Sequence, residues 1–257
     1  MAHRSNVSVA DDPFAEGGTL PETLPEHPWD IFEQWWTDAH TGGDDGKPIT
    51  ANPNAMNLAT LNADGTPASR IVLCKQYATD ADTGASVGTA EGTGRIVFYT
   101  NYEGGKGTQL AASPVAAACF HWDALDRQVR VEGPITQSPA SESDAYFNSR
   151  HILKRLGAWA SNQSRPVETR DQLLEQYAEV LERFNVPMGV VAGEEPADDI
   201  TVPRPPHWGG FRLWARRVEL WIGGKGRFHD RAEWTRDLTR TDDGYTGGPW
   251  SRTRLQP

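Results

Sequence analysis

Two periods of hydrophobic and polar residues run along this chain, and the change between them predicts its architecture. Residues 28–39 begin at a proline and repeat aromatic side chains at helical spacing, which predicts a helix with an apolar face. From residue 55 the period falls to two, which is typical of half-buried strands. A short helix ending at Ala112 and helices over residues 139–149 and 170–184 are also expected. The aromatic residues of the first helix are Trp29, Phe32, Trp35 and Trp36.

Short strands separated by turns account for most of the remaining chain. Residues 55–62 and 68–77 flank an Asp-Gly turn at Asp64 and Gly65, which predicts a β-hairpin. A polar insertion at 78–94 and a Pro-rich loop at 185–206 interrupt the pattern. Further strands are expected at 95–101, 115–122, 127–137, 208–215, 217–222, 227–234 and 250–255.

This spacing of strands favours one mainly β domain with peripheral helices, over residues 27–257. Short antiparallel strands with few helices between them are typical of a closed or partly closed β-barrel. Residues 1–26 are rich in Asp, Glu, Gly and Pro and lack apolar periodicity, so we expect a mobile or loosely docked arm.

Composition narrows the classes of partner. The net charge of −10 over 257 residues argues against nucleic acid, so any bound anion must be held by locally collected Lys and Arg. Cys74 and Cys119 lie far apart in separate apolar runs, which favours reduced core thiols and a cytoplasmic protein. The longest apolar run, 115–120, is too short to cross a membrane.

Common catalytic and metal motifs are missing from the sequence. The seven histidines show no paired spacing for zinc, so no metal is expected. The chain has no G-x-S-x-G, no P-loop and no G-x-G-x-x-G, which leaves no support for a serine hydrolase, a P-loop nucleotide site or a Rossmann site.

One basic row stands out in the C-terminal part of the chain. Arg227, His229 and Arg231 alternate after the glycine-rich residues 223–226, so on a strand all three side chains would share one face. By itself this row fits either a ligand site or a solvated edge strand.

Three further basic groups carry the same ambiguity between a ligand site and an exposed surface. Lys106 precedes a predicted helix, where free backbone N–H groups favour phosphate. Arg70 and Lys75 differ in parity, so on one strand they would face opposite sides. The third group follows an i, i+4, i+8 spacing, which on one helix would form a row able to grip a phosphate. Its members are Tyr146, Arg150 and Lys154.

Nine segments in order make the chain resemble the pyridoxamine 5′-phosphate oxidase family from about residue 29 to residue 257. The segments read N-A-M-N-L-A-T, S-R-I-V-L-C-K, V-F-Y-T-N-Y, R-Q-V-R-V-E-G, S-D-A-Y-F-N-S-R, G-A-W-A-S-N-Q-S-R-P, P-P-H-W-G-G-F-R, R-F-H-D-R and R-L-Q-P. The resemblance implies an FMN-binding split β-barrel that works as a homodimer, with the flavin at the subunit interface.

The family's reaction and site residues are carried over by this resemblance alone. It implies oxidation of pyridoxamine or pyridoxine 5′-phosphate at C4′ by hydride transfer to FMN, with dioxygen reduced to hydrogen peroxide. Arg227 and His229 match catalytic positions. The matching substrate positions are Lys75, Tyr146, Arg150, Arg227 and His229, and Lys154 adds a cation on that side. The matching FMN positions are Arg70, Ile71, Val72, Leu73, Cys74, Lys75, Tyr99, Thr100, Lys106, Gln128, Gln163, Ser164, Trp221 and Arg231.

The sequence departs from the family pattern at three places. The family's N-terminal Arg-x-x-Tyr is missing, since Arg4 is the only arginine before Arg70 and the first tyrosine is Tyr77. The glycines of residues 104–105 replace Ser-Arg before Lys106, and Lys154 stands where the family usually has Ser.

Two other functions stay open at this point. The N-terminal D-P-F-A-E and P-E-T-L-P-E-H-P also resemble phenazine-biosynthesis oxidases, which use FMN on a tricyclic substrate without a phosphate. A non-catalytic protein that binds flavin or carries pyridoxal phosphate is the other alternative.

Overall fold

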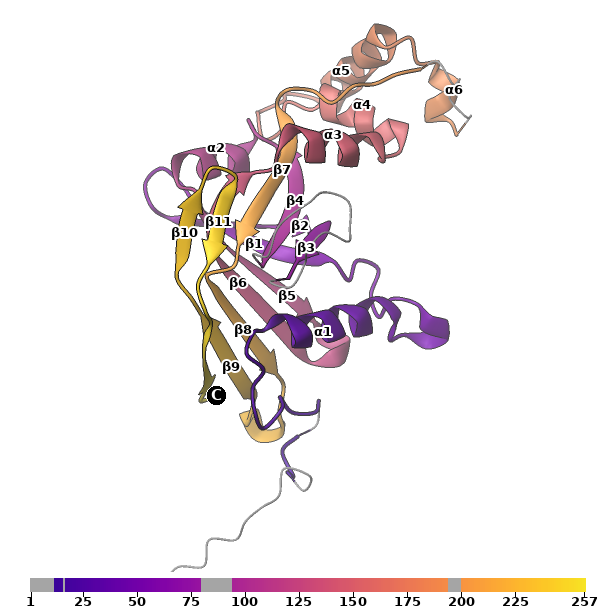
Figure 1. Cartoon of the computed structure of the whole chain (residues 1–257). Helices are drawn as coiled ribbons and strands as arrows, with labels where there is room; N and C mark the ends of the chain where they lie inside the picture. Colours follow the sequence, from indigo (N-terminus) through magenta and orange to yellow (C-terminus); the bar gives the residue numbers. More distant parts are fainter. Residues whose placement is uncertain (1–11, 16, 80–93, 194–199) are drawn as a thin grey trace, which may run out of the picture.

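A partly closed β-barrel with helices around it forms the body of the molecule (Figure 1). The computed structural model describes residues 12–15, 17–79, 94–193 and 200–257. Ten strands form one branched antiparallel sheet in the order β12-β9-β8-β6-β5-β1-β2, with β7 joining β6 to β4 and β4 pairing with β3. The expected mainly β, single-domain split barrel with peripheral helices is confirmed.

The strands and helices follow the expected order. The strands are β1 (Ala55–Leu61), β2 (Pro67–Leu73), β3 (Gln76–Ala78), β4 (Arg95–Asn101), β5 (Val115–Trp122), β6 (Arg127–Gln137), β7 (Trp208–Trp214), β8 (Arg217–Ile222), β9 (Asp230–Thr235), β10 (Leu238–Thr241), β11 (Gly244–Gly247) and β12 (Ser251–Leu255). The helices are α1 (Trp29–Thr41), α2 (Gly105–Ala112), α3 (Ala140–Asn148), α4 (Ile152–Ala160), α5 (Arg170–Arg183) and α6 (Met188–Val191), with 3-10 turns η2 (Asp44–Gly46), η3 (Asp123–Leu125) and η4 (Lys225–Arg227).

The core fills the inner face of the sheet, and α1 supplies part of it. Trp29, Phe32 and Trp35 of this helix are buried in the same cluster as the barrel's inner residues. Burying each such side chain contributes at least about 1.5–3 kcal/mol, which fixes the helix to the barrel. Leu20 and Leu24 join this cluster, so the described part of the N-terminal segment is packed against the barrel.

Strand register separates two faces with different chemistry. Directly paired residues share a face, so Arg70, paired with Leu58, belongs to the inner row that continues through Ala118, Val131 and Val218. The outer face carries polar rows instead. One of them runs across β5, β6, β8 and β9 through His121, Gln128, Trp221 and Arg231.

Two strand predictions were wrong in ways that matter for the site. The strand expected over 68–77 breaks after Leu73, because Cys74 N–H donates to Asn54 O and Lys75 N–H donates to Val97 O, which transfers the chain from β1 to β4. Lys75 therefore lies between two strands, and the parity comparison with Arg70 does not apply.

The strand expected from residue 227 begins only at Asp230. Residues Lys225–Arg227 form a 3-10 turn in which Gly226 and Arg227 have φ angles of +64° and +66°. Arg227, His229 and Arg231 consequently do not share one strand face, and only Arg231 is part of β9.

The prediction that Tyr146, Arg150 and Lys154 form a row on one helix was also wrong. Helix α3 ends at Asn148, and a new helix, α4, begins at Ile152 after His151, whose side chain accepts the Leu153 N–H at 3.3 Å. Helices α4 and α6 and the β10–β11 hairpin are further elements that the sequence pattern did not predict. The 80–93 part of the expected insertion lies outside the described residues.

Candidate functional site

A first group of predicted residues lies where β2 and β4 meet the start of α2. Arg70 donates to Leu58 O at 3.1 Å, Thr60 Oγ1 at 2.5 Å and Gln109 Oε1 at 2.7 Å. Lys106 Nζ donates to Thr100 Oγ1 at 3.0 Å and to Gln163 Oε1 at 2.7 Å. We call Arg70, Thr100, Lys106, Gln163 and Ser164 the α2 cluster.

The two cations of the α2 cluster have only neutral acceptors in the described part of the chain. Burial, followed by the nearby charge of Arg70, lowers the pKa of Lys106, and burial lowers the pKa of Arg70. Two partly buried cations without a carboxylate are unfavourable by themselves. A bound phosphate would supply the missing negative charge, so this cluster fits the phosphate of FMN.

The departure from the family pattern has a steric reason at residue 104 but not at residue 105. A Cβ at Gly104 would lie 2.5 Å from Gln163 Oε1, whereas one at Gly105 would meet Ser164 Oγ at 3.5 Å, an ordinary contact. Glycine at position 104 thus lets the Gln163 amide approach Lys106. The start of α2 lies beside Gln163 and Ser164, and the first N–H groups of a helix have no acceptor within the helix.

A second group of cations collects near the loop between α3 and α4. Burial first, then the charges of Lys154 and Arg150, lower the pKa of Lys75, so both charges lie near enough to act on its ammonium group. The buried Nη1 of Arg150 has no hydrogen-bond partner. We call Lys75, Tyr146, Arg150 and Lys154 the α3–α4 cluster, and its unpaired donor fits an anion.

Aromatic rings form the wall beside this second group. Tyr99 and Tyr146 stack with centroids 4.0 Å apart, and Tyr99 lies 5.6 Å from the Trp208 ring. The Arg150 guanidinium lies over Trp208 at 4.6 Å, which fixes its plane. Burial, followed by the neighbouring Glu142 carboxylate, raises the pKa of Tyr99, so its phenol stays protonated.

The predicted residues of β6, β8 and β9 lie on the outer face, away from both clusters. Gln128 and Trp221 are directly paired, and Trp221 pairs with Arg231. Arg231 Nε and Nη2 donate to Glu219 Oε1 at 3.0 and 2.7 Å, and Nη1 donates to Gln256 O at 2.9 Å. Unlike Arg70, Arg231 therefore has a carboxylate partner.

Arg227 and His229 lie on the exposed η4 turn and the residues that follow it. The backbone N–H of Gly224 donates to His229 Nδ1 at 3.1 Å, so the neutral imidazole carries its proton on Nε2. The His229 ring lies 4.7 Å from the Trp221 ring. Figure 1 shows the turn between β8 and β9 at the opposite end of the barrel from α2 and α4.

The remaining predicted FMN positions are successive residues of β2 and its end. Ile71 is 64% exposed on the outer face, whereas Val72 and Leu73 are half-buried. Burial raises the pKa of the Cys74 thiol to about 12, so this cysteine is not a nucleophile. Both cysteines are free thiols, and Cys119 is half-buried rather than fully in the core.

Sequence reasoning missed two residues that organise these groups. Gln109 accepts from Arg70 and Thr60 and donates to Asn62 Oδ1 at 2.6 Å, which fixes the guanidinium. Its spacing of three from Lys106 on α2 was the available signal. Trp208, the platform under Arg150, gave none, because its partners lie far away in the sequence.

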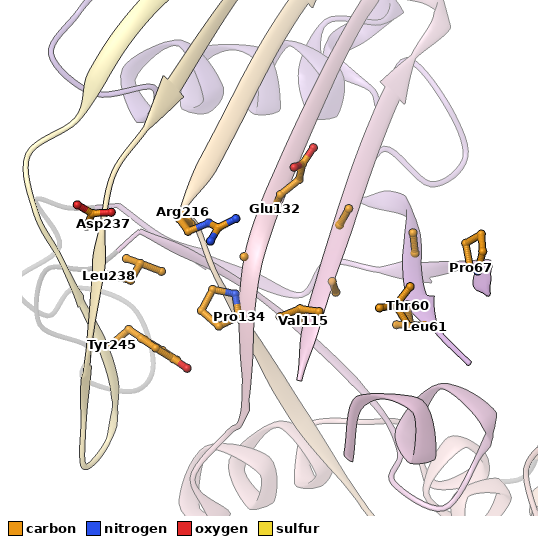
Figure 2. A pocket seen from close by; sticks show the side chains of 14 residues that line it. Thr60, Leu61, Pro67, Val115, Glu132, Pro134, Arg216, Asp237, Leu238 and Tyr245 are labelled. Atoms are coloured by element: carbon orange, nitrogen blue, oxygen red, sulfur yellow. The ribbon is translucent and has the colours of Figure 1, made fainter. Parts of the chain in front are cut away.

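A separate hollow of about 530 Å³ lies on the outer face between the sheet and the β10–β11 hairpin (Figure 2). Small and apolar residues such as Ala59, Leu61 and Pro134 line most of it, with Glu132 and Arg216 among the charged ones. None of the predicted site residues lines this hollow. Hollow size alone therefore does not identify the site.

Metal and membrane features can be stated for the described ranges only. Within residues 12–15, 17–79, 94–193 and 200–257, no three His, Cys, Asp or Glu side chains group as metal ligands. Over the same ranges, every helix is too short or too polar to span a bilayer.

Comparison with known proteins finds family matches in two regions of the chain. Residues 45–183 match the pyridoxamine 5′-phosphate oxidase family, and residues 208–257 match the pyridoxine 5′-phosphate oxidase C-terminal dimerisation region. A pyridoxine/pyridoxamine 5′-phosphate oxidase of Bordetella pertussis is 41% identical over 253 residues, 98% of this chain and 100% of the relative. That of Methylibium petroleiphilum is 42% identical over 243 residues, 94% of each chain.

Solved structures share the fold at lower sequence identity. PhzG from Burkholderia lata 383, in complex with tetrahydrophenazine-1-carboxylic acid, has a TM-score of 0.68 at 24% identity, covering 93% of this chain and 100% of that one. A pyridoxamine 5′-phosphate oxidase-related, FMN-binding protein from Nostoc punctiforme has a TM-score of 0.57 at 17% identity, covering 91% and 100%. The matched regions and the relatives of about 40% identity show that this chain belongs to the pyridoxamine 5′-phosphate oxidase family.

Proposed function

We propose that this chain is an FMN-dependent oxidase that converts pyridoxamine 5′-phosphate, pyridoxine 5′-phosphate or both to pyridoxal 5′-phosphate, with dioxygen reduced to hydrogen peroxide. The observation that carries the proposal is the presence of two clusters of cations that have no carboxylate partner among the described residues. The α2 cluster would hold the phosphate of FMN, and the α3–α4 cluster the phosphate of the substrate. An enzyme that joins two phosphorylated molecules needs two such sites.

Arg150 is the central residue of the proposed substrate-phosphate site. Its Nη1 is buried without a partner, and Lys75 and Lys154 add positive charge beside it. Charge-assisted bonds from Arg150 and the Tyr146 hydroxyl to a phosphate would contribute about 1.5–3 kcal/mol each. The aromatic wall of Tyr99 and Trp208 would keep water from this end.

A homodimer follows from the placement of the predicted residues. Arg70 lies on the inner face of β2, while Gln128, Trp221 and Arg231 lie on the outer face three, four and five strand positions away. At about 4.8 Å per strand, β2 and β9 are some 24 Å apart along the sheet. One flavin that contacts both sets would therefore lie between two chains, as the match to a dimerisation region supports.

Bound FMN would supply the oxidising chemistry by taking a hydride equivalent from substrate C4′ and passing the electrons to dioxygen. Arg227, exposed on its turn, would align the substrate and stabilise the charge that develops during the reaction. His229 would donate a hydrogen bond from Nε2, since its Nδ1 accepts from Gly224. The other chain of the dimer would bring this turn to the α3–α4 cluster. We also propose a cytoplasmic location, on the ground that both cysteines are free.

The test uses the purified protein, its flavin absorbance and peroxide release. We expect peroxide with pyridoxine or pyridoxamine 5′-phosphate and none with a dihydrophenazine carboxylate, which has no phosphate for Arg150. Turnover of the phenazine alone would favour the phenazine-type oxidase. A flavin spectrum without turnover of either vitamer would favour the non-catalytic alternative.

The catalytic role proposed for Arg227 is tested with a variant of that residue. Arg227→Leu removes the exposed guanidinium but leaves every residue of the α2 cluster in place. We expect at least about a tenfold fall in kcat, with the same flavin content per chain. Unchanged turnover would contradict the role of Arg227.

A further inference from the structure

The N-terminal segment is fastened to the turn that carries Arg227. Phe14 O accepts the backbone N–H of Lys225 at 2.9 Å, and the Phe14 ring lies 5.0 Å from the ring of Phe228. These two contacts place Phe14 against both ends of η4. Phe228 is 63% exposed, and the Phe14 ring covers part of it.

Further contacts anchor the same segment beyond Phe14. Leu20 N–H donates to Asp230 Oδ2 at 2.8 Å, and Leu20 itself is only 2% exposed. Arg254 bonds the other oxygen of Asp230 and donates to Pro21 O at 2.7 Å. Residue Gly17 lies close to Ile222, since a Cβ there would meet Ile222 Cγ2 at 3.1 Å. The segment is therefore held on the last residue of β8 and the first of β9.

The turn itself has a conformation that needs support. Arg227 has a φ of +66°, in the left-handed region that residues with a Cβ avoid. On the other side, Gly223 N–H donates to Asp126 O at 2.8 Å, and Phe228 N–H closes the turn on Lys225 O at 3.1 Å. Strained backbone persists only where its surroundings hold it. Phe14 supplies that hold on the open side of the turn.

The segment also shapes the surroundings of His229. Phe14, Leu20, Phe228 and His229 are among the residues lining a hollow of about 250 Å³ between the segment and the turn. The N-terminal part of the sequence lacks the family's Arg-x-x-Tyr. The segment therefore has no arginine and tyrosine of that motif with which to contact the substrate.

We propose that Phe14 is a positioning residue, which holds the η4 turn so that Arg227 and His229 face the substrate. The proposal rests on the proposed function, because it concerns the same two residues. The N-terminal arm, which lacks the family's motif, would thus act on the substrate indirectly. Phe14 would hold the η4 turn by its packing on Phe228 and by one backbone hydrogen bond.

Phe14→Ala tests this in the full-length protein loaded with FMN. Aromatic pairs of this kind typically account for about a three- to tenfold effect, so we expect kcat to fall by that factor with flavin content unchanged. Phe14→Leu should restore most of the activity, because it keeps an apolar contact. Leu174→Ala, a truncation of another exposed apolar residue on α5, should leave kcat unchanged. The double variant Phe14→Ala/Phe228→Ala should be no worse than Phe228→Ala alone.

A second readout is independent of activity. Lys225 and Arg227 are exposed trypsin sites on the turn, and the exposed Arg240 of β10, which is followed by Thr241, is an internal control. Phe14→Ala should speed cleavage at the turn about three- to tenfold without changing cleavage at Arg240.

The outcomes separate the two proposals. Faster cleavage at the turn together with lower kcat supports the positioning role. Unchanged cleavage, or faster cleavage with unchanged kcat, overturns it. If the wild-type protein turns over neither vitamer but Phe14→Ala still loosens the turn, the proposed function fails while the hold of Phe14 on the turn stands.

Discussion

The cations of the α2 cluster and the arginines of the outer sheet face differ in what surrounds them. On the outer face, Arg130, Arg217 and Arg231 alternate with Glu132, Glu219 and Glu233 in five ion pairs across β6, β8 and β9. Arg70 and Lys106 have amide, hydroxyl and carbonyl oxygens only. A paired arginine has its charge compensated within the fold, whereas a partly buried cation without a carboxylate is favoured by a bound anion. Basic residues alone therefore do not mark the site; their partners do.

Arg231 shows the difference between the two regions most clearly, because it is a predicted FMN residue that has a carboxylate partner. It matches an FMN position by resemblance, yet Glu219 already holds two of its donors. We expect Arg231 to orient neighbouring groups at the dimer interface more than to neutralise a phosphate. Its contribution to FMN affinity should accordingly be smaller than that of Arg70.

The largest effect is expected on stability, from the outer face. Glu219 is 2% exposed and lies between Arg130 and Arg231. Glu219→Gln leaves two neighbouring cations without their shared carboxylate, which should lower the free energy of unfolding by about 3 kcal/mol. Urea unfolding measures this, with Glu175→Gln on exposed α5 as a control expected to stay within about 0.5 kcal/mol. Equal midpoints for wild type and Glu219→Gln would show that the network does not stabilise the fold.

The next effect is expected on FMN affinity, from the α2 cluster. Arg70→Ala removes a cation that has three neutral acceptors and no carboxylate. We expect the Kd for FMN to rise about 30- to 100-fold, the equivalent of one charge-assisted bond. Flavin fluorescence titration gives the value. Arg217→Gln, which removes a paired arginine, should change Kd by less than about threefold. Similar losses in both variants would remove the distinction between the two regions.

A smaller effect is expected on substrate binding, from the α3–α4 cluster. Arg150→Ala should raise KM for pyridoxine 5′-phosphate about tenfold with little change in kcat, because its phosphate contact is the same in the ground and transition states. Lys154→Ser should raise KM only about twofold, since Lys154 is exposed to solvent. Steady-state peroxide assays separate the two. A larger effect of Lys154 than of Arg150 would contradict the placement of the phosphate.

The smallest effect is a pH dependence of FMN affinity. Burial, then Arg70, lower the pKa of Lys106 below the usual 10.5, and a bound phosphate would raise that pKa again. The contribution of Lys106 to binding is thus complete below its pKa in the free protein and is lost as pH rises through its pKa in the complex. We expect FMN affinity to begin to weaken below pH 10.5 as pH rises, and Lys106→Arg to flatten the curve. A wild-type curve as flat as that of Lys106→Arg would exclude Lys106 as the titrating group.

Much of the barrel was predictable because its signals are local. The strand over 127–137 alternates apolar and polar residues, and the strands over 95–101, 115–122 and 217–222 are short runs rich in apolar residues; the structure has the same bounds for all four. The break after Leu73 was not predictable, because distant acceptors at Asn54 and Val97 decide it.

The site was harder to predict than the fold for a related reason. Alternation of bases at 227–231 imitates a strand, although Gly226 and Arg227 turn left-handed there. The predicted cations themselves could be found in the sequence. Which acceptor each cation has could not be predicted, since Gln109 bonds Arg70 and Glu219 bonds Arg231 from other elements and only the fold brings them into contact.

The most direct measurement compares the binding of FMN and riboflavin to the wild-type apoprotein by titration calorimetry. Both ligands carry the same ring, so the difference isolates the phosphate and the α2 cluster that is proposed to hold it. We predict that FMN binds at least about 100-fold more tightly than riboflavin, and that Lys106→Ala removes most of the difference. Equal affinities for the two ligands would contradict the claim that the unpaired cations of this chain form its phosphate site.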